Sequence, residues 1–129
     1  MNTLKLKESI TIFKDHLGDA LVSSDIWNKK NGLSIASYQS NERYTALFSR
    51  IIGQMENALK DLEFPPIGNY QIVDLEGDLL LLMINFKDEY IWGSLIDKTK
   101  TSLGDLIFIA VHKAQKSFIN AIENVDAYE

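Results

Sequence analysis

Residues 40–64, SNERYTALFSRIIGQMENALKDLEF, decide the fold, because they predict one long amphipathic helix. Ser40 or Asn41 can cap its first free N–H groups, and the Pro65-Pro66 pair ends it. We expect its apolar face to lie on a β-sheet. The apolar residues recur at helical i, i+3, i+4, i+7 spacing and are Tyr44, Leu47, Phe48, Ile51, Ile52, Met55, Ala58, Leu59 and Leu62.

The opposite side of the same helix carries a track of small residues, Ala46, Ser49 and Gly53. Arg50, Glu56, Asn57 and Lys60 surround this track. Small side chains let a second backbone approach closely, whereas glycine inside a helix costs about 1 kcal/mol relative to alanine. Gly53 therefore indicates either a packing contact or mere tolerance, and the sequence leaves both open.

A helix and a hairpin precede this stretch. Residues 3–17 place Leu6, Ile10, Phe13 and Leu17 on one helical face, and Gly18 ends that helix. Residues 20–27 and 33–38 read as two strands joined by a polar loop, Asn-Lys-Lys-Asn-Gly. The Asn-Gly pair supplies the positive φ that hairpin turns require.

Three strands and a last helix follow it. Residues 69–75, 79–86 and 90–97 are separated by polar turns, and the middle segment is apolar without alternation, which is typical of a strand covered on both faces. The last helix begins at Thr101 or Ser102. Because Phe108, Ile109 and Ile119 fall outside its apolar stripe, we expect this helix to contact something besides the sheet, and the first helix is the obvious neighbour.

These elements predict a single α+β domain spanning residues 1–129, in the order α-β-β-α-β-β-β-α. About five mainly antiparallel strands would carry the long helix on one face and two helices on the other. We expect Leu81 and Leu106 to be buried in this sandwich.

Composition narrows the class of protein. The chain of 129 residues has no cysteine, so neither disulfides nor thiolate metal sites hold it together. Its net charge is −5, and its 13 Lys and Arg residues are scattered, which argues against nucleic acid as a partner. The longest apolar run, residues 79–84, is too short to span a bilayer, and no signal peptide is apparent. We expect a cytoplasmic protein without stable membrane insertion.

No catalytic constellation emerges from the sequence. The turn bearing Asp74, Glu76 and Asp78 lacks the further ligands of a calcium loop, and neither His16 nor His112 has a second histidine at chelating spacing. The phosphate-loop and dinucleotide fingerprints are absent. Ser23, Ser24 and Asp25 lie in a strand rather than a nucleophile elbow. We therefore expect no metal, no cofactor and no enzymatic activity.

Two segments together resemble a known family. Leu21-Val22-Ser23-Ser24 followed by Asn31-Gly32-Leu33-Ser34-Ile35-Ala36-Ser37 resembles the first hairpin of the roadblock family of dynein light chains and GTPase regulators. Thr101-Ser102-Leu103-Gly104 resembles the start of that family's final helix. The element order also agrees over nearly the whole chain. Family hairpins usually turn on Asp-Gly, whereas this chain has Asn-Gly after a longer loop.

The resemblance implies a profilin-like fold and a non-catalytic adaptor that docks on a small Ras-like GTPase. It also implies a homodimer, or a heterodimer with a related roadblock-type subunit, joined through the long helix and the strand after it. Mapped onto this chain, the interface would comprise Ala46, Ser49, Arg50, Gly53, Glu56, Asn57, Tyr70, Gln71, Ile72 and Val73.

A sensor domain of the PAS-like kind is the alternative. Such a domain would hold a small molecule between sheet and helix, in a cavity with a few convergent polar groups. Trp27, Tyr38, Tyr90 and Trp92 could line a cavity of this kind, although large aromatics in strands more often fill a core. The unbroken apolar run of residues 79–84 favours a filled core, and so an adaptor.

Overall fold

The order of elements is the one that the sequence predicts. The computed structural model describes residues 3–86 and 88–126, with side chains described as far as residue 122. The elements are α1 (Thr3–Leu17), η1 (Gly18–Ala20), β1 (Leu21–Asn28), β2 (Ser34–Tyr38), α2 (Glu42–Asp61), β3 (Tyr70–Asp74), β4 (Leu79–Phe86), β5 (Tyr90–Asp97), α3 (Leu103–Asp105), a π-helical segment η2 (Leu106–Ala110) and α4 (Val111–Asp126).

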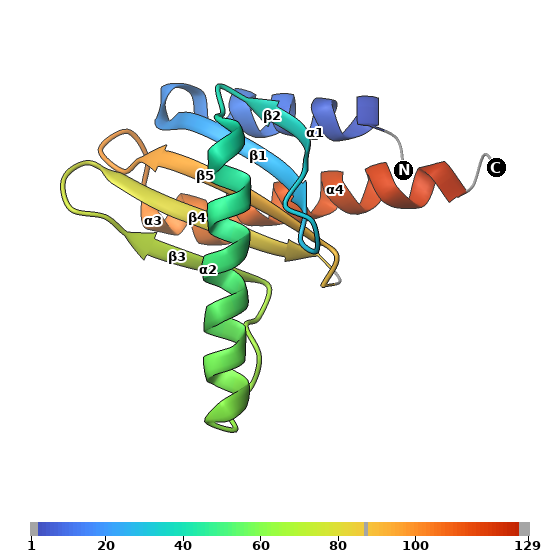
Figure 1. The fold of residues 1–129 in the computed structure, drawn as a ribbon. Coiled ribbons are helices and arrows are strands. Elements are labelled where there is room, and N and C mark those ends of the chain that lie inside the picture. The colour runs from blue at the N-terminus through green and yellow to red at the C-terminus, as the bar shows by residue number, and fades with distance from the viewer. Residues whose placement is uncertain (1–2, 87, 127–129) are drawn as a thin grey trace.

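The strands form one antiparallel sheet in the order β2-β1-β5-β4-β3. The hairpin β1–β2 and the meander β3–β4–β5 are both as predicted, and β1 joins them by pairing with β5. Strands β2 and β3 are therefore the two edges. In Figure 1, α2 crosses one face of this sheet while α1 and α4 cover the other, which confirms the predicted α+β sandwich.

The larger core lies between the sheet and the α1–α4 layer. Phe13 of α1 packs against Trp92 of β5, with ring centroids 5.1 Å apart, and Phe118 of α4 stacks on Phe86 of β4. Leu106 is completely buried there, as predicted. Leu81, in contrast, is only half-buried, because its side chain points to the α2 face, which the helix covers incompletely.

The smaller core lies under α2 and consists of Trp27, Ile52, Met83 and Ile91, with Phe48 against it. The absence of a side chain at Gly93 leaves room for the Trp27 indole, because a Cβ on Gly93 would lie 2.6 Å from the ring. The helix thus rests on the sheet over a small apolar area.

Local signals explain where the hairpin turns and where α2 begins and ends. The Asn41 side chain accepts a hydrogen bond from the N–H of Arg43 and caps the helix. At the other end Glu63 takes a positive φ of 59°, ahead of the two prolines. In the hairpin, Gly32 has a φ of 70°, as the Asn-Gly pair predicts.

The start of the last helix differs from the prediction. Ser102 does cap it, accepting a hydrogen bond from the N–H of Asp105. A π-helical segment then follows, and Phe108 and Ile109 within it are 74% and 45% exposed. Ile119 is also exposed. The last helix does lie beside α1, as expected, and the buried residues of the two helices belong to one core cluster.

Candidate interaction surface

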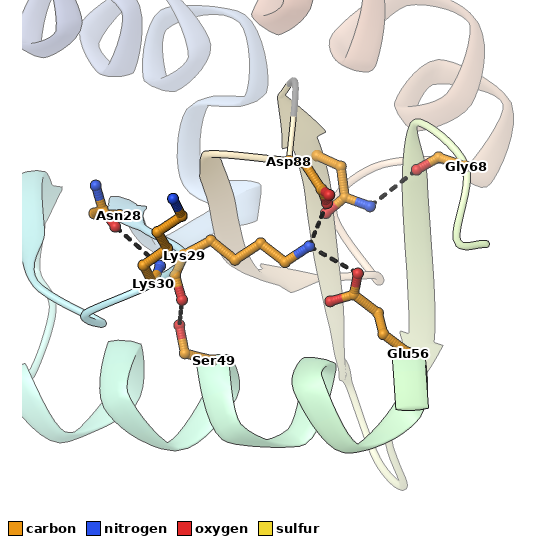
Figure 2. A network of polar contacts seen from close by, with 8 residues as sticks. Asn28, Lys29, Lys30, Ser49, Glu56, Gly68 and Asp88 are labelled. Carbon is orange, nitrogen blue, oxygen red and sulfur yellow. Dashed lines mark hydrogen bonds and ion pairs between the residues drawn. The ribbon is translucent and has the colours of Figure 1, made fainter. Parts of the chain in front are cut away.

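The inner face of α2 is held by polar contacts that the sequence did not indicate. The Nε1–H of Trp27 donates to the hydroxyl oxygen of Ser49 over 2.7 Å. Lys29 Nζ lies 2.7 Å from Glu56 Oε2 and 2.5 Å from Asp88 Oδ1 (Figure 2). Lys29 therefore ties the β1–β2 hairpin to α2 and to the turn between β4 and β5.

The surroundings of Lys29 favour its charged form. Burial alone would lower the pKa of Lys29, but its hydrogen bonds and ion pairs with Asp88 and Glu56 outweigh burial and raise that pKa. The hydrogen bond from Lys29 lowers the pKa of Asp88. The lysine is thus a fixed positive charge with two carboxylate partners.

These contacts correct the prediction about the small-residue track. Ser49 and Glu56 are half-buried and have partners within the chain, so this part of the track does not lack a cover. If Arg50 of a second copy were to pair with Glu56 across an interface, it would have to compete with Lys29, which already forms an ion pair with Glu56. Ala46, Arg50 and Asn57 are exposed, and a Cβ on Gly53 would meet nothing within 4 Å.

The predicted cover of the apolar face is also wrong. We use the name apolar stripe for the row of exposed apolar side chains along one flank of α2. Among its large side chains, exposure runs from 38% at Met55 to 62% at Leu62. The 3.6-residue pattern identified an amphipathic helix correctly, but the helix meets its own sheet mainly through Ile52 and Phe48. The stripe comprises Tyr44, Leu47, Ile51, Met55, Ala58 and Leu62.

An open apolar trough lies on the sheet beside α2. Its volume is about 270 Å³, and it lies between the start of α2 and the turn that joins β3 to β4. Its polar members include Asp25, which is 5% exposed and accepts a hydrogen bond from the Ser34 hydroxyl. Burial raises the pKa of Asp25 to about 6, against the opposing effect of that hydrogen bond. The apolar side chains around it are Trp27, Tyr44, Phe48, Leu75, Leu79, Leu81, Met83 and Leu95.

Strand β3 is an edge next to this trough. Tyr70 is exposed, and Gln71, Ile72 and Val73 are half-buried. Only β4 pairs with β3 in the described part of the chain, so the outer side of its backbone has no strand neighbour there. Such an edge can accept a strand from a second chain.

The residues considered for chemistry have structural roles. Asp74 pairs with Lys98, and His16 lies 3.1 Å from Asp105. Ser24 accepts a hydrogen bond from the Trp92 indole and shares one with Ser94 inside the core. Within the described residues, no cluster of three or more histidine or acidic side chains could hold a metal. None of the helices described is both long and apolar enough to cross a membrane.

Comparison with known proteins identifies the fold. No family model matches the sequence, and no curated protein matches it. Among solved structures, MglB of Myxococcus xanthus superposes with a TM-score of 0.80 at 16% identity, over 95% of this chain and 90% of that one. A Roadblock/LC7 domain from Streptomyces avermitilis gives a TM-score of 0.63 at 12% identity, covering 91% and 94% of the two chains.

Schizosaccharomyces pombe profilin gives a TM-score of 0.58 at 11% identity, covering 92% of this chain and 97% of its own. These likenesses confirm the roadblock resemblance at the level of the fold, which is profilin-like.

Proposed function

We propose that this chain, which has the roadblock fold, is a non-catalytic dimeric adaptor that binds a small Ras-like GTPase. The apolar stripe of α2 carries the proposal. Its six residues leave a continuous apolar flank exposed on a helix of 20 residues. An exposed apolar patch of this kind is typical of a protein–protein contact rather than of an isolated surface.

A second copy of the chain fits this surface. In Figure 1 the C-terminal half of α2 projects past β3, the edge of the sheet. If the β3 strands of two copies pair antiparallel about a two-fold axis, both α2 helices lie on the same face of the joined sheet. Each projecting helix end then reaches over the open trough of the other copy. This single arrangement would cover the stripe, the trough and the β3 edge of each copy.

The proposed dimer interface therefore comprises the apolar stripe together with Tyr70, Gln71, Ile72 and Val73. Ala46, Arg50, Gly53 and Asn57 flank it on the other side of the helix. Ser49 and Glu56, which the resemblance also placed in the interface, make contacts that hold α2 on its own sheet, and we leave them out of the proposed interface.

The likeness to MglB and to a Roadblock/LC7 domain supports a regulatory role, in line with the GTPase regulators that the sequence resembles. The chain's two arginines, Arg43 and Arg50, are both exposed on α2. They leave a trans-acting arginine geometrically possible, although an adaptor does not require one. The proposal assigns binding to this chain, and hydrolysis to the GTPase.

Two measurements test the proposal separately. Light scattering of the purified chain at tens of micromolar should give the mass of a dimer, and a monomer would contradict the interface. Calorimetry with each small Ras-like GTPase of the source genome, loaded with GDP or a non-hydrolysable GTP analogue, should show saturable binding that favours one nucleotide state. A dimer that binds none of them in either state would remove the GTPase from the proposal while leaving the interface intact.

A further inference from the structure

A second cavity lies on the opposite side of the molecule, between α4 and the adjoining ends of β4 and β5. Its volume is about 460 Å³, within the range of small-molecule sites, and it opens to the surface beside the packed core. None of its residues belongs to the apolar stripe or to the four proposed contacts of β3. The lining residues are Asn69, Asn85, Phe86, Glu89, Tyr90, Gln115, Phe118, Ile119 and Ile122.

The floor of this cavity is aromatic and fixed by packing. The rings of Phe86 and Phe118 stack with centroids 3.8 Å apart, and Tyr90 lies tilted against Phe118 at 5.7 Å. Both phenylalanines are buried in the larger core. Ile119 and Ile122 of α4 complete an apolar wall. The site is thus preformed, and it can receive an apolar or aromatic body without rearranging the core.

Polar groups surround that floor with unused hydrogen-bonding capacity. The side chains of Asn69, Glu89, Tyr90 and Gln115 make no hydrogen bond to any residue that the structure describes. Asn85 donates its amide N–H to the carbonyl of Gly68, while its own Oδ1 is buried without a partner. Because that oxygen is enclosed, a ligand in the preformed cavity does not reach it, and the groups open to a ligand are the other polar side chains.

The charge of the lining residues narrows the chemical class of ligand. Among the described residues that line the cavity, Glu89 is the only charged one, so its carboxylate disfavours a carboxylate or phosphate there. The Glu89 carboxylate, which lines the cavity, calls for a donor on the ligand. We infer that this cavity binds a small aromatic or aliphatic amine, with its apolar body on the Phe86–Phe118 floor and its ammonium group toward Glu89. This inference is independent of the proposed dimer and of the GTPase.

A matched pair of probes tests the inference on the full chain. Tryptamine and indole-3-acetate share an indole body but carry opposite charges. In ¹H–¹⁵N correlation spectra at millimolar probe, tryptamine should saturably shift the amides of the lining residues. Its dissociation constant should be about tenfold below that of indole-3-acetate, as expected for attraction against repulsion at a partly exposed carboxylate. Glu89→Gln should reduce that preference to less than about threefold.

A blocking variant separates this site from other surfaces. Ile119→Trp puts a bulky ring into the wall and should abolish the shifts, whereas Ile109→Trp should preserve them. Ile109 has a similar exposure, 45% against 40%, and does not line the cavity. The inference is overturned if neither probe produces saturable shifts, if both bind equally well, or if the shifts survive Ile119→Trp.

Discussion

The indole Nε1–H of Trp27, on strand β1, donates a hydrogen bond to the hydroxyl oxygen of Ser49 on α2, with 2.7 Å between the two atoms. The indole is 1% exposed, so water cannot replace this acceptor. Ser49→Ala should therefore lower the free energy of unfolding by about 1–3 kcal/mol, the cost of leaving a buried donor unpaired. Urea denaturation measures the change. Ser37→Ala, on the exposed side of β2, is the control and should stay within about 0.5 kcal/mol of wild type.

Gly93 faces the same indole, and it should not tolerate a side chain. A Cβ there would lie 2.6 Å from the Trp27 ring, which is held in place from the other side by α2. Gly93→Ala should cost about 1–3 kcal/mol through overpacking. Gly104→Ala is the matched control, because a Cβ there meets nothing within 4 Å and alanine is the better helix former. Equal stabilities of the two variants would show that the indole can move aside.

The buried carboxyl of Asp25 should make stability fall as pH rises. Its pKa is raised from 3.8 to about 6 in the folded state, so between these values the folded chain holds a proton that the unfolded chain has lost. The penalty of burying the charge is absent below about pH 4 and complete above about pH 6, where the shift corresponds to about 3 kcal/mol.

Asp25→Asn should remove that dependence while keeping an oxygen acceptor for Ser34. Unfolding of the two proteins, measured by urea denaturation at several pH values, should give equal free energies near pH 4. The asparagine variant should be the more stable one near pH 7. A difference that is constant across this range, or one that favours wild type at neutral pH, would show that the carboxyl is not desolvated.

Much of the fold was predictable because its signals are local. The Pro65-Pro66 pair, the Asn-Gly turn and the serine and asparagine caps mark element ends, and the spacing of apolar residues separates helix from strand. The covering of a surface is not local. The pattern from Tyr44 to Leu62 shows that α2 is amphipathic. Residues 40–64 do not reveal whether the chain's own sheet or a second protein chain covers the apolar flank. Prediction therefore assigned it to the sheet, which buries mainly Ile52.

The contacts of two predicted interface residues were missed for the same reason. Ser49 and Glu56 looked unpartnered because their partners, Trp27 and Lys29, are more than 20 residues earlier in the chain. The cavity beside Phe118 depends on side chains from segments that are far apart in the sequence. The spacing of residues along the sequence does not reveal contacts between segments that are far apart in the chain. The edge position of β3, by contrast, follows from the meander once β1 is paired with β5.

The last prediction decides which flank of α2 meets a second copy. Ile51 lies in the apolar stripe, 47% exposed, and Gly53 lies on the small-residue flank with open space around its Cα. Burying the stripe removes far more apolar surface from water than a contact at Ala46 and Gly53 could. Ile51→Glu should therefore convert the dimer to a folded monomer, because the variant would bury an unpaired carboxylate in the interface.

Gly53→Arg tests the alternative flank in the same experiment, and Ile109→Glu, which places the same charge at an equally exposed isoleucine on the far side of the sheet, is the control. Light scattering should find Gly53→Arg and Ile109→Glu dimeric, with circular dichroism confirming that every variant is folded. If Gly53→Arg is monomeric and Ile51→Glu remains a dimer, the small-residue flank is the contact and the stripe awaits a different partner.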